Sequence, residues 1–158
     1  MADPLNGRRV PRLALATLGD VALFDGERRC ELPSTAKARL LLVYLAMHPG
    51  RPVSRDELAA IGWPESDEDR ARASLSTALW AIRKSLADAG AGADALVAGR
   101  AAVTFAGDVA VDALRFEQAA AAGDDAEADR LYAGPFLRDE YGDWAIAQRE
   151  QPRQHGLG

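Results

Sequence analysis

Apolar and polar residues alternate along residues 13–32, "LALATLGDVALFDGERRCEL". Alternation with a period of two is typical of strands that bury one face. Gly19-Asp20 and Asp25-Gly26 interrupt the alternation, and Asp-Gly between two such runs indicates a hairpin turn. The pattern therefore predicts two or three short antiparallel strands, at about Leu13–Leu18, Val21–Phe24 and Arg28–Leu32.

Helical spacing begins after Pro33, where Ser34 or Thr35 can cap a first helix. The run "LLLVYL" at residues 40–45 is apolar nearly all round, which is typical of a helix at the centre of a core. "HPG" at residues 48–50 ends this helix. Ser54, with Glu57 three residues later, has the sequence of a capping box and predicts a second helix.

A third helix is predicted over residues 69–86, "DRARASLSTALWAIRKSL". One apolar stripe runs along it at helical spacing: Leu75, Leu79, Ile82 and Leu86. After Asp69 the segment carries four cations and no carboxylate: Arg70, Arg72, Arg83 and Lys84. The stripe predicts one buried face, and the opposite face carries positive charge.

"LVAGRAAVTFAG" at residues 96–107 predicts a hairpin with residues 98–100 near its turn, and short helices are expected at 114–122, 125–133 and within 141–150. A sheet, three helices and a hairpin, in that order, are typical of a winged helix with an added N-terminal sheet. The predicted fold class is therefore α+β: a winged helix-turn-helix with an N-terminal antiparallel sheet and a C-terminal β-hairpin wing, followed by short α-helices. The predicted units are a disordered segment 1–11, a winged-helix domain 12–112, a helical segment 113–150 and a flexible tail 151–158.

Composition supports a packed domain outside the membrane. The chain has 158 residues, of which 48% are hydrophobic, and its single cysteine excludes an internal disulfide. No apolar run approaches the roughly 20 residues of a membrane span, and the N-terminus lacks a secretory apolar core, so we expect a cytoplasmic protein. The net charge is -5, but residues 1–112 hold 14 basic and 15 acidic residues, against 5 and 9 in residues 113–158. The acidic excess therefore lies mainly in the last third.

Residues suited to catalysis are sparse. His48, His155 and Cys30 show no metal-ligand spacing, and "AGAG" at 89–92 lacks the Lys and Ser/Thr of a phosphate loop. We therefore expect no catalytic residue, no cofactor and no metal, and hence no enzyme.

The third helix has the properties of a helix that reads DNA. Duplex DNA carries one negative charge per about 1.7 Å, so such a helix needs an apolar face, an opposite face without carboxylates, and small polar groups near the bases. Residues 70–86 meet all three requirements, although a solvated amphipathic helix has the same pattern. Trp80 is expected to pack partly on the domain with its N–H directed to a phosphate, and Arg100 either is an idle surface charge or reaches the minor groove.

"HPGRPVSRDEL", "WP" and "L-(x)3-L-(x)2-IRKSL" resemble the OmpR/PhoB-type winged helix in its SARP-like form, the Streptomyces antibiotic regulatory proteins. "YAGPFLRDEYGDWAIAQRE" is similar to the opening of the bacterial transcriptional activator domain. The resemblance covers about residues 12–150. It implies a regulator that binds double-stranded DNA at promoter direct repeats, with a dimer on the repeats and an RNA polymerase contact through residues 62–68.

The resemblance also implies roles for individual residues. Ser54 and Arg55 open the helix that meets a phosphate strand, Arg72 lies near the start of the recognition helix, and Arg100 belongs to the wing. The recognition helix presents Ser76, Thr77, Trp80, Arg83 and Lys84 to DNA. Since the resemblance ends early in the activator domain, we expect this segment to activate poorly by itself. A winged-helix module that binds a protein and not DNA remains the alternative, and the acidic last third fits it.

Overall fold

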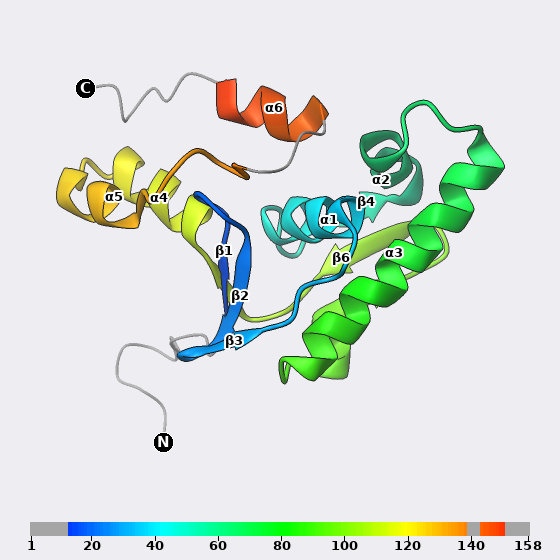
Figure 1. Ribbon diagram of the computed structural model, residues 1–158, viewed down its shortest axis with the longest axis horizontal. Helices are drawn as coiled ribbons and strands as arrows, with labels where there is room; N and C mark the ends of the chain where they lie inside the picture. Colours follow the sequence, from blue (N-terminus) through cyan, green and yellow to red (C-terminus); the bar gives the residue numbers. More distant parts are fainter. Residues whose placement is uncertain (1–12, 139–142, 151–158) are drawn as a thin grey trace.

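The computed structural model describes residues 13–138 and 143–150, and Figure 1 shows their arrangement. The N-terminal sheet lies in the middle of the molecule beside helix α1. Helices α2 and α3 lie at one end and helices α4 and α5 at the other. The predicted disordered segment 1–11 and flexible tail 151–158 lie outside the described residues.

The alternating N-terminal segment forms the predicted antiparallel strands β1 (Leu13–Ala16), β2 (Ala22–Asp25) and β3 (Arg28–Cys30). Leu15 pairs with Leu23, and Leu23 pairs with Cys30, so the alternation directs these three side chains into the core. A fourth strand, β7 (Val109–Val111), pairs in parallel with β1 and completes the order β3-β2-β1-β7. The sequence analysis missed β7, because three residues are too few to show alternation.

Helix α1 (Ala36–Ala46) forms the centre of the core, as predicted. Thr35 caps it, with its side chain accepting a hydrogen bond from the Ala38 backbone N–H at 3.2 Å. Every residue from Leu40 to Ala46 is buried, and α1 packs against α2, α3 and strand β6. A helix that is apolar all round needs such neighbours on several sides.

Helix α2 (Arg55–Gly62) begins at the predicted cap, since Ser54 Oγ accepts a hydrogen bond from the Glu57 backbone N–H at 3.0 Å. Only half of the capping box forms. The Glu57 carboxylate instead accepts hydrogen bonds from the Tyr44 hydroxyl and, at 3.1 Å, from Arg51. This contact ties α2 to the end of α1.

Helix α3 (Glu68–Asp88) is 21 residues long and includes the predicted segment. Asp67 caps it by accepting a hydrogen bond from the Arg70 backbone N–H at 2.8 Å, and Glu68 and Asp69 complement the helix dipole in the first turn. The predicted stripe is confirmed: all four of its members are at most 5% exposed, namely Leu75, Leu79, Ile82 and Leu86.

The wing is a hairpin of β5 (Leu96–Ala98) and β6 (Ala102–Phe105), as predicted. The Gly99 N–H donates to the Ala102 carbonyl at 2.8 Å and closes the turn. A short strand β4 (Val53–Ser54), missed by the sequence analysis, pairs with β6 and gives the order β4-β6-β5. The wing is therefore attached to the residue that caps α2.

Three helices follow the wing: α4 (Asp112–Ala121), α5 (Asp125–Leu131) and α6 (Asp143–Glu150). The side chain of Asp112, at the start of α4, accepts hydrogen bonds from the Thr17 N–H at 2.8 Å, the Thr17 hydroxyl at 2.6 Å and the Leu18 N–H at 3.0 Å. The helical segment is thereby fastened to the end of β1.

Residues 135–138 run beside residues 17–19 and reinforce this attachment. The Gly19 N–H donates to the Pro135 carbonyl at 2.8 Å, and the Leu137 N–H donates to the Thr17 carbonyl at 2.7 Å. Phe136 and Leu137 are buried, and Arg149 of α6 donates to the carbonyls of both. Phe136 and Leu137 are therefore part of the core.

Candidate nucleic-acid interface

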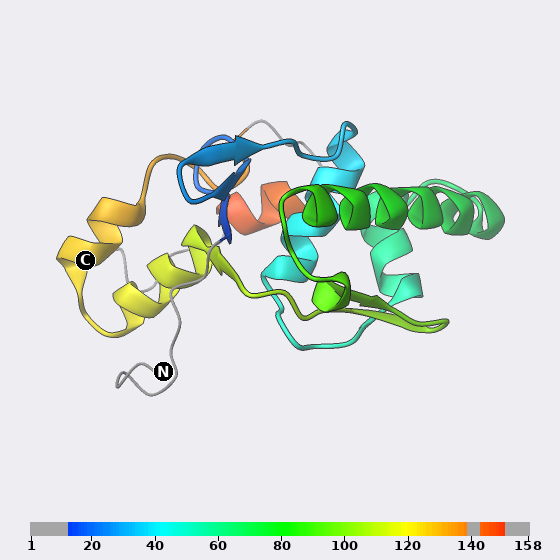
Figure 2. The ribbon, with the colours of Figure 1, turned by 90° about the horizontal axis from the view of Figure 1, so that it is seen from below.

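Helix α3 and the wing extend toward the same end of the molecule, with α2 beside them (Figure 2). The apolar stripe of α3 faces α1, and the opposite face is open to solvent. All six residues predicted to act from this helix are exposed: Arg72, Ser76, Thr77, Trp80, Arg83 and Lys84. The exposed positions from 70 to 87 include no carboxylate. The helix therefore presents the surface that the sequence predicted.

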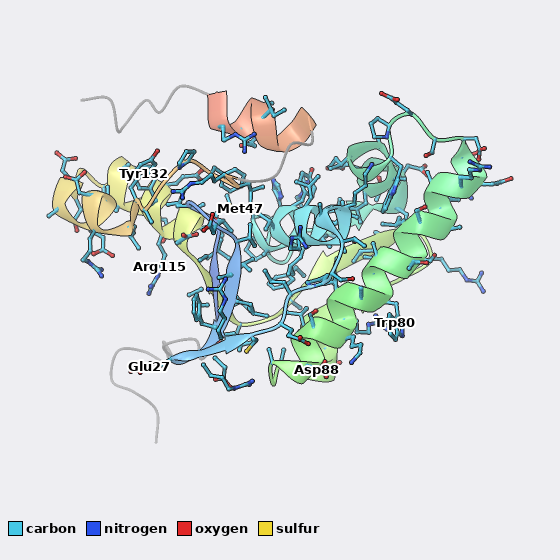
Figure 3. All side chains as sticks on the ribbon, viewed as in Figure 1. Glu27, Met47, Trp80, Asp88, Arg115 and Tyr132 are labelled. Carbon is cyan, nitrogen blue, oxygen red and sulfur yellow. The ribbon has the colours of Figure 1, made fainter. Side chains whose placement is uncertain are left out.

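Trp80 is more exposed than predicted. Its side chain is 65% exposed and projects from α3 on the side away from α1 (Figure 3). The neighbours one turn away do not cover it, because Ser76 and Thr77 are short and Lys84 reaches along the helix to Asp88, at 3.1 Å. A large indole left in water is a candidate contact surface.

The cations of α3 lie before and after residues 73–80 along the helix, and each has a partner in the structure. Arg72 forms ion pairs with Glu68 at 3.4 Å and with Asp56 of α2 at 3.7 Å. Arg83 donates to the Leu96 carbonyl of the wing at 3.2 Å. The ion pairs are exposed, and exposed pairs contribute only about 0–1 kcal/mol, so a phosphate can replace the carboxylates at little cost.

Arg55 connects α2 to the wing turn. Its Nε donates to the Gly99 carbonyl at 2.8 Å, and its backbone N–H donates to the Ala101 carbonyl at 2.9 Å. The sequence analysis assigned Arg55 to phosphate alone and missed this second contact, since the partner residues lie more than 40 positions away along the chain. Arg100, the side chain between those two carbonyls, is exposed, and the structure gives it no ion pair within the described residues.

A groove of about 680 Å³ lies between the start of α2, the first half of α3 and the wing turn. Five of the nine predicted residues line it: Ser54, Arg55, Arg72, Ser76 and Arg100. Asp56, Leu75 and Ala101 complete the lining. The other four predicted residues, Thr77, Trp80, Arg83 and Lys84, continue along α3. Asp56 is the one acidic side chain that lines the groove, and the sequence analysis did not identify it.

Other polar clusters within the described residues have structural roles. Cys30 is buried in β3, and a His48 ring nitrogen lies 2.8 Å from the Tyr44 carbonyl at the end of α1. Burial raises the pKa of the Tyr44 hydroxyl, and the hydrogen bond and charge of Glu57 raise it further. The described residues include no group of three or more potential metal ligands, and none of their helices is long and apolar enough to cross a membrane.

The sequence matches one protein family, and the fold is similar to a solved structure. Residues 29–100 match the family described as "transcriptional regulatory protein, C terminal", and the matched span runs from β3 to the wing turn. A solved structure, "Mycobacterium tuberculosis EmbR in complex with low affinity phosphopeptide", is similar with a TM-score of 0.71 and 26% identity, over 89% of this chain. This chain covers 41% of that one, so it spans less than half its length. No curated protein matches the sequence.

Proposed function

We propose that this chain, whose residues 29–100 match the C-terminal family of transcriptional regulatory proteins, the OmpR/PhoB-type winged helices, acts on DNA. The chain is a DNA-binding transcription regulator, and the matched family is not a class of enzymes. The finer proposal is that α3 enters the major groove of a promoter and reads its sequence. One observation carries this proposal: the solvent face of α3 lacks carboxylates from 70 to 87 and shares a groove with the wing turn.

The arrangement supports a division of roles among the nine predicted residues. Ser76 and Thr77 occupy the middle of the exposed face and are assigned to base edges. Trp80 joins them in this proposal, in place of the expected phosphate contact, because its indole is 65% exposed beside them. The cations before and after residues 73–80, Arg72, Arg83 and Lys84, are assigned to phosphates. Ser54 and Arg55 at the start of α2 meet a phosphate strand, because a helix N-terminus attracts anions.

We further propose that the chain acts as a SARP-type activator on direct repeats, with one copy on each repeat. The similarity to EmbR over most of this chain supports the proposal. The loop at residues 62–68, between α2 and α3, is the proposed RNA polymerase contact, since residues 64–67 are exposed and lead directly into α3.

Selection of bound sequences from random duplex DNA, at stated salt concentrations, tests the core proposal. We expect a consensus sequence and a linear fall of log K with log salt, with a slope of about -0.9 for each phosphate neutralised. Absence of binding at every salt concentration would contradict DNA recognition and favour a protein-binding module.

Arg100→Ala tests the wing. A narrow A·T-rich minor groove attracts arginine, so the substitution should weaken binding and reduce any preference for A·T-rich flanking DNA. The melting temperature should stay nearly unchanged, because Arg100 is exposed. If the variant binds A·T-flanked and G·C-flanked sites as the wild type does, the wing has only a structural role.

A further inference from the structure

Residues 73–80 of α3 include no charged side chain. Ala73, Ser76, Thr77 and Trp80 are exposed in this segment, and the cations of the helix lie before it and after it along the chain. Arg72 turns toward Asp56 of α2, and Arg83 turns toward the Leu96 carbonyl of the wing. The segment 73–80 therefore includes no arginine or lysine for the contact with guanine that these side chains make.

Thr77 presents its methyl group rather than a hydroxyl proton. Its Oγ1 donates to the Ala73 carbonyl one turn earlier, at 3.2 Å. The hydroxyl hydrogen is therefore engaged within the helix, and the Cγ2 methyl and an acceptor oxygen remain for a ligand. Of the four base pairs, those with thymine offer a methyl group in the major groove.

Trp80 extends this apolar surface by one turn. It lies three residues after Thr77 on the same side of the helix and is 65% exposed. Ala73, Thr77 and Trp80 together form an exposed apolar patch, on the face opposite the buried stripe. At 1.5 Å per residue the patch is about 10 Å long, the length of about three base pairs. No other described residue covers most of the indole, so a DNA surface can bury it.

We infer that the exposed apolar patch recognises thymine C5-methyl groups in the major groove. The inference rests on the proposed function, because it names what α3 reads when α3 lies in that groove. The chemistry of the patch indicates what it binds. The patch is apolar, and cations that suit phosphates lie before and after it along the helix. The one base group that is both apolar and exposed in the major groove is the thymine methyl.

Two random duplex libraries test the inference, one containing thymine and the other containing deoxyuridine in its place. Uracil keeps the hydrogen-bonding groups of thymine and lacks only the methyl. We expect the tightest sequence selected from the thymine library to contain thymine in its core. Replacing one contacted thymine there by uracil should weaken binding by about fourfold, the effect of exposing one buried methyl. Replacement outside the bound segment is the control and should have no effect.

Two variants of Thr77 identify the group that reads the base. Thr77→Val keeps the methyl and removes the hydroxyl, and we expect it to bind the thymine site within about twofold of the wild type and to keep the preference for thymine over uracil. Thr77→Ser keeps the hydroxyl and removes the methyl, and it should lose about fourfold on the thymine site and bind both duplexes equally.

The outcomes separate this inference from the proposed function. Binding to neither library contradicts DNA recognition itself. Sequence-specific binding that is equal for thymine and uracil sites overturns the methyl readout and leaves the proposed function standing. Loss of the preference in Thr77→Val but not in Thr77→Ser assigns recognition to the hydroxyl and also overturns the inference.

Discussion

Arg55 shows how one side chain on this surface serves two elements. It opens α2, and its guanidinium holds the Gly99 carbonyl of the wing turn at 2.8 Å. The remaining N–H groups of the guanidinium can still donate to a phosphate. Arg100 directly follows Gly99 in the wing turn. Its direction therefore depends on Arg55, a residue of another element.

Arg55→Ala should consequently affect both stability and binding. We expect the free energy of unfolding to fall by about 1 kcal/mol, the usual effect of one lost hydrogen bond, and DNA affinity to fall as well. Chemical denaturation and a DNA titration measure the two effects. Arg28→Ala, which removes an exposed arginine paired with Asp25 of the N-terminal sheet, is the matched control. Lost affinity without lost stability would reduce Arg55 to a phosphate contact.

Tyr44 gives a pH-dependent contribution to stability at the contact between α1 and α2. Its pKa is raised in the folded state by burial and by Glu57, so the folded protein holds the hydroxyl proton more tightly than the unfolded chain does. The resulting stabilisation is present below the ordinary tyrosine pKa of about 10 and is lost as the pH rises through the folded-state value. Tyr44→Phe should therefore be less stable than the wild type at pH 7, and the difference should narrow above about pH 10. Denaturant titrations at the two pH values measure this, and a constant difference would contradict the assignment.

Elements with a strong local period could be predicted from the sequence, and those without one could not. The stripe of α3 and the alternation of β1 and β2 depend on side-chain spacing within each segment, which any reader of the sequence can see. Strands β4 and β7 have two and three residues, and each exists because a partner from a distant part of the chain lies beside it. The six site residues on α3 could be placed on its exposed face for the same reason. The partners of Arg55 and Arg72 could not, since those contacts join separate elements.

Asp56 tests the relation between α2 and α3. It places a carboxylate in the groove that faces DNA and pairs with Arg72 at 3.7 Å. Asp56→Asn should strengthen binding to all sequences by about two- to fivefold, because it removes repulsion of phosphate and releases Arg72. Titrations on specific and random duplexes measure the change, with Asp129→Asn, exposed on α5, as the control. Weaker binding by Asp56→Asn would instead show that Asp56 holds Arg72 in its binding position.

At the scale of the whole molecule, charge is distributed between the two ends. The winged-helix part is nearly neutral in sum, but the exposed positions from 70 to 87 carry cations and no carboxylate, whereas residues 113–158 hold 9 acidic and 5 basic residues. The acidic helices α4 and α5 lie at the end opposite α2 and α3 (Figure 1). Phosphates should therefore favour one orientation of the molecule on DNA, with the acidic helices directed away from the duplex.

The attachment of α4 and residues 135–138 to the end of β1 bears on how the chain folds. Thr17 and Asp112 are separated by 95 positions, so the contact closes a long loop, and contacts of this kind tend to form late. During synthesis, the first strand has to wait for partners that leave the ribosome about 95 residues later. Thr17→Val, which removes the 2.6 Å hydroxyl bond to Asp112, should therefore speed unfolding by about fivefold while leaving the refolding rate nearly unchanged. Stopped-flow measurement of both rates tests this, and a slower refolding rate would place the closure in the folding nucleus.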